Sequence, residues 1–204
     1  MLPALVLTLG FLLYRLLFLL AGAPVPWENF SPLAAICLCT GAYARNRRDV
    51  VWPLAGLAVS DVVLNAHYHV TLLDTRMLPG YFCFLALFAL GRVVRGVPRH
   101  RVPWLLGASA AGSILYYLVT NTFDWWFDGP APYALTPYAH NLAGWWQALT
   151  IGHPGFPPTL FFLRNSLASD LLFTVLFVAT QTVFSPVSRI PVASPVRTPN
   201  LPDI

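Results

Sequence analysis

The sequence contains no lysine, and only 10% of its 204 residues are charged. A soluble domain would carry about 25% charged residues, so a soluble globular protein is excluded. Hydrophobic residues make up 57% of the chain, which is typical of an integral membrane protein. All twelve basic residues are arginines, and they cluster along the chain. The formal charge of +4 therefore reflects the orientation of the chain in a membrane, with the lipid bilayer as its partner. Nucleic acid is not expected as a partner.

Cysteine is scarce, and several catalytic motifs are missing. Cys37, Cys39 and Cys83 are odd in number and all lie in apolar runs, which argues against a disulfide framework. No GxxxxGK[ST] phosphate loop occurs, so ATP hydrolysis of the P-loop type is excluded for this chain. Neither GxGD nor GxSG, the motifs expected of intramembrane proteases, is present.

Six apolar stretches are separated by polar or proline-rich breaks. They cover approximately residues 2–22, 32–44, 50–66, 77–95, 103–121 and 159–184. Several are shorter than the ~20 residues of a full helical span. The pattern predicts an all-α integral membrane protein that forms a six-transmembrane-helix bundle. The short spans are expected to be tilted or broken helices around a cavity, or loops that dip into the membrane.

Arginines mark alternate loops. The second loop, the fourth loop and the tail carry Arg45, Arg47, Arg48, Arg92, Arg95, Arg99, Arg101, Arg189 and Arg197. The other loops carry Glu28, Asp74, Asp124 and Asp128, with Arg76 as the one clear arginine. By the positive-inside rule, the arginine-bearing loops and both termini are predicted to be cytoplasmic.

The chain is predicted to form a single transmembrane domain over residues 1–184. Residues 185–204 are proline-rich and predict a disordered cytoplasmic tail. Residues 21–23 resemble a signal-peptidase site, but the first stretch lacks a basic n-region and Arg15 interrupts its apolar run, which favours a retained helix. Cleavage would leave five spans with the same orientation.

The fifth loop, residues 122–158, is long, external and aromatic. Its aromatic residues are Trp125, Trp126, Tyr133, Tyr138, Trp145 and Trp146. Two interpretations stay open. Trp and Tyr form belts at the membrane interface, whereas loops longer than about 15 residues are often functional, here as a lid over a large flat ligand.

Ionisable residues inside spans are functional candidates, because each costs about 2.5 to 3.5 kcal/mol at the bilayer centre. They are Arg15, Asp61 and Asp170, with Arg164 near an outer helix end. Helical spacing places Asn65 and Tyr68 on the same face of the third span as Asp61. In the sixth span, four residues share one face: Ser166, Ser169, Asp170 and Phe173. Both faces should turn inward. Each aspartate either fixes packing against a neighbouring helix or contributes to a site.

His67 and His69, in the stretch NAHYH, do not predict a metal site. A spacing of two places the imidazoles on different helical faces, and no HExxH or CxxC motif completes a ligand set. His67 is instead a candidate to reach a ligand from the rim.

Cys83 lies about six residues inside the fourth span, ~9 Å below its outer end. Gly80, Leu87 and Gly91 recur with it at helical spacing and form a stripe of mostly small residues that should face the bundle. The thiol is therefore predicted to point into the protein, either as packing or as a ligand. Cys37 and Cys39 lie at comparable depth in the second span.

Short motifs across residues 29–181 resemble membrane proteins related to the substrate-binding S-components of energy-coupling-factor (ECF) transporters, and most closely the BtuM-type cobalamin transporters. The motifs are NFSPLAA at 29–35, GAY at 41–43, PLA at 53–55 before Ser60 and Asp61, Thr120 and Asn121 before Trp125, and FLRNSL at 162–167 before Asp170. The resemblance implies an S-component-like six-helix bundle with both termini in the cytoplasm and a pocket open to the outside. It also implies that Cys83 coordinates the cobalt of the corrin.

The function expected from this resemblance is cobalamin uptake across the cytoplasmic (inner) membrane, with cobalamin as transported ligand and no cofactor of the protein's own. Cys83 would also be the catalytic residue if the thiolate promotes loss of the upper cyanide ligand. An ECF energy-coupling module is a possible partner, although the first helix offers only Ala4 and Thr8 as the small residues used for docking. The expected substrate-binding residues are Cys83, Tyr81, Asn29, Asp61, His67, Tyr68, Trp125, Trp126, Trp145, Trp146, Arg164, Asn165 and Asp170.

Two alternatives stay open. One is an S-component-like transporter for another vitamin or small apolar ligand. The other is an intramembrane enzyme or assembly factor that uses Asp61 and Asp170.

Overall fold

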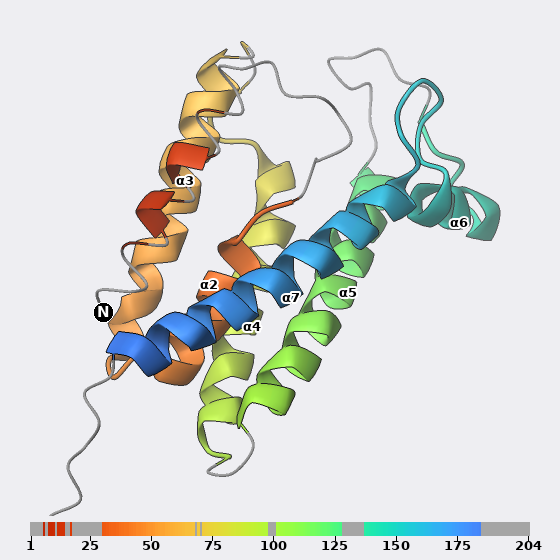
Figure 1. Cartoon of the computed structure of the whole chain (residues 1–204). Helices are drawn as coiled ribbons and strands as arrows, with labels where there is room; N and C mark the ends of the chain where they lie inside the picture. Colours follow the sequence, from red (N-terminus) through yellow and green to blue (C-terminus); the bar gives the residue numbers. More distant parts are fainter. Residues whose placement is uncertain are drawn as a thin grey trace, which may run out of the picture.

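A computed structural model describes residues 30–67, 69, 71–97, 101–127 and 137–184, with residues 6, 8–10, 12–14 and 17 of the first apolar stretch. The predictions for signal cleavage, Arg15 and the tail 185–204 lie outside the described residues. Every regular element in the described ranges is a helix (Figure 1). The helices are α2 (Leu33–Tyr43), η2 (Arg47–Val50), α3 (Val51–His67), η3 (Thr75–Met77), α4 (Leu78–Arg95), α5 (Arg101–Phe127), α6 (Leu142–Thr150) and α7 (Thr159–Phe184).

Four described helical segments are long and apolar enough to cross a membrane. They are Arg47–His67, Thr75–Arg95, Arg101–Phe127 and Thr159–Gln181. The all-helical membrane architecture expected from composition is therefore confirmed at this level. The expected second span differs: α2 has 11 residues, or about 16 Å of helix, which is about half of a hydrocarbon core.

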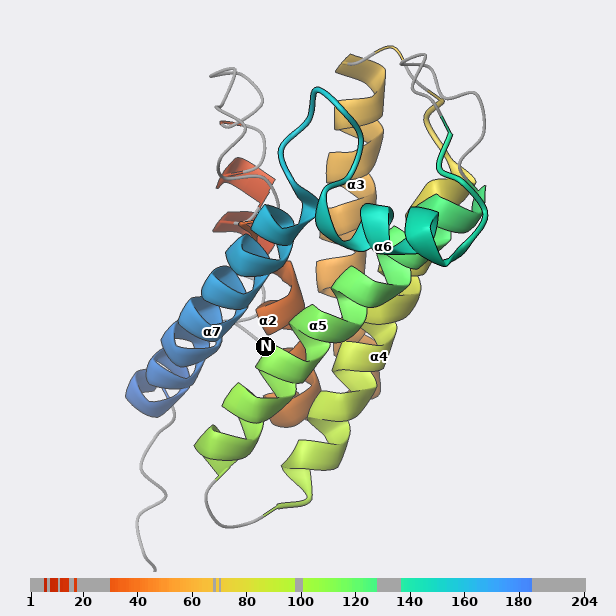
Figure 2. The same ribbon diagram turned by 90° about the vertical axis from the view of Figure 1, so that its right-hand side faces the viewer.

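Helix α2 lies at the centre of the bundle. It packs most extensively against α4, and also against α7, α5 and α3 (Figures 1 and 2). Leu38, Cys37 and Cys39 have no exposed surface, and every residue from Ala35 to Ala42 is buried. A helix that is apolar on all sides is expected to be enclosed by other helices. This explains how α2 can be both very apolar and short.

Two glycines set the closest approach between α2 and α4. A methyl group placed on Gly41 would collide with the backbone carbonyl of Phe88, and one on Gly91 would collide with that of Leu38. Because the obstacle in both cases is backbone, no side-chain rotation relieves it. The two helices therefore approach closely only because neither residue has a side chain.

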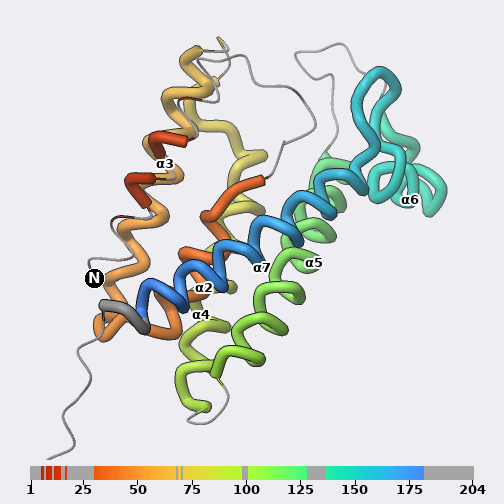
Figure 3. Tube along the Cα trace, in the orientation of Figure 1, coloured from red at the N-terminus to blue at the C-terminus, as the bar shows by residue number. Residues whose placement is uncertain are grey.

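The arginine-bearing loops meet at one end of the bundle, here called the arginine-rich end. The guanidinium groups of Arg92 and Arg95 donate to the carbonyl oxygen of Ala44 at 3.1 and 2.7 Å. Arg101 donates to the carbonyl oxygen of Arg95 at 3.3 Å. Helix α7 runs obliquely across α2 and ends near this level (Figure 3). The alternating arginines thus correctly indicated which loops share an end.

The C-terminal end of α3 and the start of α4 lie at the opposite end of the bundle, where α6 also lies beside the C-terminal end of α5 (Figure 2). The prediction that 122–158 is a loop is wrong for its two aromatic segments. Residues 122–127 continue α5, since no glycine or proline follows Gly112 in the sequence until Gly129 and Pro130. Helix α6 begins after Asn141, whose side chain accepts a hydrogen bond from the Gly144 amide at 2.9 Å.

Candidate functional site

Cys83 is the sixth residue of α4 and lies in the half of that helix at the opposite end. It is buried, with 4% of its surface exposed. The rest of its stripe also faces the bundle: Gly80 lies near Tyr116, Leu87 contacts Gly112 of α5, and Gly91 contacts α2. The inward orientation predicted from the small-residue stripe is confirmed.

A hydrogen bond from Tyr81, two residues before Cys83 in the chain, joins α3 to α4. The Tyr81 hydroxyl donates to Oδ2 of Asp61 at 3.1 Å, and Asp61 is 8% exposed. Tyr81 also packs against the apolar cluster that contains Phe84 and Leu87. Asp61 therefore has the role expected of an aspartate that fixes the packing of two helices, here α3 and α4.

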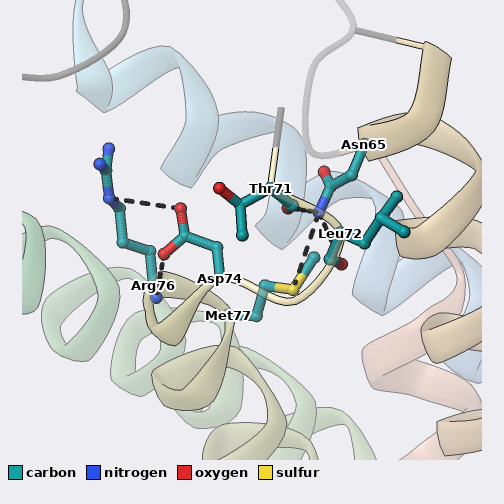
Figure 4. Close-up of polar contacts among 6 residues, drawn as sticks. All are labelled: Asn65, Thr71, Leu72, Asp74, Arg76 and Met77. Carbon is teal, nitrogen blue, oxygen red and sulfur yellow. Dashed lines mark hydrogen bonds and ion pairs between the residues drawn. The ribbon is translucent and has the colours of Figure 1, made fainter. Parts of the chain in front are cut away.

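The loop between α3 and α4 is tied to α3 by Asn65 (Figure 4). The Asn65 side-chain amide donates to the carbonyl oxygens of Thr71 and Leu72 at 3.1 and 3.2 Å and lies 4.0 Å from the Met77 sulfur. Asp74 accepts a hydrogen bond from the Arg76 amide at 2.9 Å and caps η3. Asn65 is one turn from Asp61, as predicted, so one face of α3 contacts both the loop and Tyr81.

Replacing Asn65 with alanine is expected to release this loop. The loss of two hydrogen bonds to backbone should lower the free energy of unfolding by about 1 kcal/mol, and should increase amide hydrogen exchange in residues 71–77. Hydrogen-exchange mass spectrometry measures the second effect directly.

Asn121→Ala is the matched control, because the Asn121 side chain donates to the Tyr117 carbonyl of its own helix at 2.8 Å. That variant should leave exchange in residues 71–77 unchanged. Equal exchange in the Asn65→Ala variant and the unmodified protein would contradict the role assigned to Asn65.

Asp170 belongs to a second polar cluster, in the interior between α5 and α7. The Ser113 hydroxyl lies 2.6 Å from Asp170 Oδ2 and 3.1 Å from the Ser109 carbonyl oxygen. Thr174 donates to the Ser109 hydroxyl at 3.1 Å. A serine hydroxyl has one proton. Ser113 therefore donates either to an ionised Asp170 or to the Ser109 carbonyl, and in the second arrangement a protonated Asp170 donates to Ser113.

The two thiols of α2 are buried in different apolar surroundings. Cys37 packs in the cluster that contains Leu57 and Phe84, and Cys39 packs against Phe177 of α7. Ser109, Ser113 and Thr174 were not singled out in the sequence, although two serines four residues apart in an apolar span were a usable signal. Ser166, Ser169 and Asp170 are buried, as the helical spacing predicted.

The remaining expected site residues do not gather at Cys83. Trp125 donates to the Ala139 carbonyl oxygen at 2.9 Å, and Trp145 donates to Thr122 at 3.0 Å, while α6 packs against α5 and α7. Trp126 and Trp146 are 60% and 63% exposed. The hydrogen bonds of Trp125 and Trp145 are therefore with α5 and with the segment before α6, and neither of them involves Cys83.

The other predicted rim residues have separate positions. Asn165 is 4% exposed and accepts from the exposed Arg164 side chain at 3.2 Å, whose guanidinium also lies 4.8 Å from the Phe161 ring. His67 is exposed at the end of α3. Asn29 and Tyr68 lie outside the described residues. Among the residues that are described, no three His, Cys, Asp or Glu side chains come together as a metal site.

Comparison with protein-family models matches residues 1–192 to DUF6580, a family of unknown function. The chain belongs to this family. The match includes every described helix, so the family match extends over Cys83, the buried aspartates Asp61 and Asp170, and the arginine-rich end. No curated protein and no solved structure matches the sequence.

Proposed function

We propose that this chain takes up a corrinoid across the cytoplasmic membrane, with the Cys83 thiolate as a ligand of the cobalt. The observation that carries the proposal is the position of Cys83. It is buried, faces the bundle, and lies in the half of α4 remote from the arginines. A thiolate is a soft ligand suited to a transition metal, and coordination favours loss of the thiol proton.

The proposed topology has six transmembrane segments with both termini in the cytoplasm. Its support is the gathering of Ala44, Arg92, Arg95 and Arg101 at one end, which the positive-inside rule assigns to the cytoplasm. Under this assignment, Cys83 lies in the outer half of the bundle. Helix α2 lies within one of the six proposed segments.

Entry of the corrin requires a movement at the outer end. Because Cys83 is only 4% exposed, a planar ring reaches the sulfur only when neighbouring elements separate. The loop held by Asn65 connects α3 to α4 and precedes Tyr81 and Cys83 in the sequence. Release of this loop from Asn65 would allow the outer ends of α3 and α4 to separate. Trp126 and Trp146 offer flat, exposed apolar surface at the same end.

The visible absorption spectrum of cyanocobalamin provides the test of the proposal. Purified protein should shift this spectrum, because thiolate coordination changes the ligand field of cobalt. Cys83→Ala should abolish the shift. Cys37→Ala is the matched control, because Cys37 is a fully buried thiol of the same bundle, and it should leave the shift intact.

An equal shift with the unmodified protein and the Cys83→Ala variant would overturn the proposed ligand. A shift lost only in Cys37→Ala would assign the ligand to α2 instead. Both variants remove a buried thiol of the same size, so the two substitutions are matched in chemistry and differ in the site at which the thiol is lost.

Coordination by Cys83 would also labilise cyanide on the other face of the corrin. Cyanide would leave as the anion with its bonding electron pair, and cobalt would stay in the Co(III) state, so the step needs no reductant. Release of free cyanide by the unmodified protein but not by Cys83→Ala is the corresponding measurement.

An energy-coupling module is a possible partner in this proposal, but Thr8 is not available to dock it. Thr8 is 4% exposed, and its methyl group lies against Gly56 of α3. Ala4 lies outside the described residues. Of the described small residues of the first helix, Thr8 therefore packs inside the bundle, whereas Gly10 is exposed and has no atom within 4 Å of an added methyl group.

A further inference from the structure

A small cavity lies at the arginine-rich end, between the end of α2, the start of α3 and the end of α7. It has a volume of about 40 Å³, which is room for roughly three water molecules. The lining residues are Thr40, Tyr43, Ala44, Asp49, Trp52, Phe177 and Gln181. None of them belongs to the proposed corrinoid site.

Two polar side chains in the cavity wall are deeply buried and have no hydrogen-bond partner among the described residues. They are Thr40 Oγ1 and Asp49 Oδ2, and their residues are 1% and 3% exposed. Buried polar atoms are normally hydrogen-bonded, and a buried carboxylate without a compensating charge is especially costly. Two such atoms lining one cavity indicate that the cavity holds a group that satisfies both.

The arginines around Asp49 do not neutralise it. Arg92 and Arg95 donate to the Ala44 carbonyl, and Arg101 donates to the Arg95 carbonyl and lies 5.5 Å from the Tyr43 ring. Within the described part of the chain, the ion pair found is Asp74 with Arg76, at the other end of the bundle. Asp49 therefore lines the cavity without an ion-pair partner among the described residues.

The geometry points to a binding site for a monovalent metal cation, coordinated by Asp49 Oδ2 and Thr40 Oγ1. Carboxylate and hydroxyl oxygens are ligands of hard cations, and Gln181, which carries a side-chain amide oxygen, also lines the cavity. One carboxylate balances one positive charge. A divalent ion would leave an excess positive charge beside Arg92 and Arg95, which electrostatics disfavours.

Thermal unfolding of the purified full chain, at constant ionic strength with choline as the replacement cation, tests this site. Na⁺ or K⁺ should raise the unfolding midpoint in a saturable manner, by about 5 °C when the ion is at roughly 100 times its dissociation constant. Asp49→Asn and Thr40→Val should each abolish the cation dependence. Asp74→Asn, which removes an acid at the opposite end, should retain it.

The unfolding midpoint of the Asp49→Asn variant should differ from that of the unmodified protein in opposite directions in the two salts. In choline the midpoint of the variant should be equal or higher, because an uncompensated buried charge has been removed. In saturating Na⁺ or K⁺ the midpoint of the variant should be lower. This crossing separates ion binding from a simple folding defect. The proposal is overturned by a midpoint that neither ion moves, by a cation effect that survives Asp49→Asn, or by a response to Mg²⁺ alone.

Discussion

Gly91→Ala is expected to destabilise the protein by about 3 kcal/mol. In an exposed helix interior the same substitution would be favourable, because alanine has the higher helix propensity. At this position the added methyl group collides with the Leu38 carbonyl of α2. Since backbone cannot rotate away, the collision requires α2 and α4 to separate along their most extensive contact.

Gly107→Ala is the matched control for this prediction. Gly107 lies within α5, is exposed, and has no atom within 4 Å of an added methyl group. Its replacement should be neutral or should stabilise by up to about 1 kcal/mol. Unfolding in detergent by heat or denaturant compares the two variants. If both substitutions shift the unfolding midpoint equally, the role assigned to Gly91 in the close approach of α2 and α4 is wrong.

Asp170→Ala is expected to cost about 3 kcal/mol, whereas Asp170→Asn should cost considerably less. Alanine removes the partner of the Ser113 hydroxyl and leaves a buried gap. Asparagine keeps a side chain of similar shape that can accept from, or donate to, Ser113. The comparison therefore distinguishes a hydrogen-bonding requirement from a requirement for negative charge.

A double-mutant cycle sharpens this second prediction. Ser113→Ala combined with Asp170→Ala should show a coupling energy of about 1–2 kcal/mol, since the two atoms form one contact between α5 and α7. Ser169→Ala is the control, because the Ser169 hydroxyl donates to the Ser166 carbonyl of its own helix at 3.0 Å. Coupling of the same size between Ser169 and Asp170 would show that the effect is general packing within α7.

Helical periodicity predicted the burial of individual side chains well. The stripe containing Cys83 and the polar face containing Asp170 both turn inward, because a span that exposes polar or small residues to lipid loses packing and hydrogen bonds. The arginine pattern likewise indicated which loops meet at Ala44. These features depend on short-range spacing or on charge, and both can be seen directly in a sequence.

Features that depend on contacts between distant segments were not predictable in the same way. The run around Cys37 has no polar face, so it could have been a membrane span or an enclosed helix, and only its neighbours decide. Trp125 and Trp145 lie between the apolar stretches 103–121 and 159–184, which predicts a loop, although each of them lies in a helix. The burial of Asp49 without an ion-pair partner could not be predicted from the sequence, because Asp49 lies among arginines with which it would be expected to pair.

The enclosure of α2 has a consequence for biosynthesis. A span leaves the insertion channel for lipid when its own apolar length suffices, but an 11-residue helix does not meet that condition. The helices against which α2 packs, α4, α5 and α7, all follow it in the chain. Helix α2 therefore reaches its final position only after later segments have been synthesised, and newly made chains truncated before α4 should retain this segment at the ribosome–channel junction.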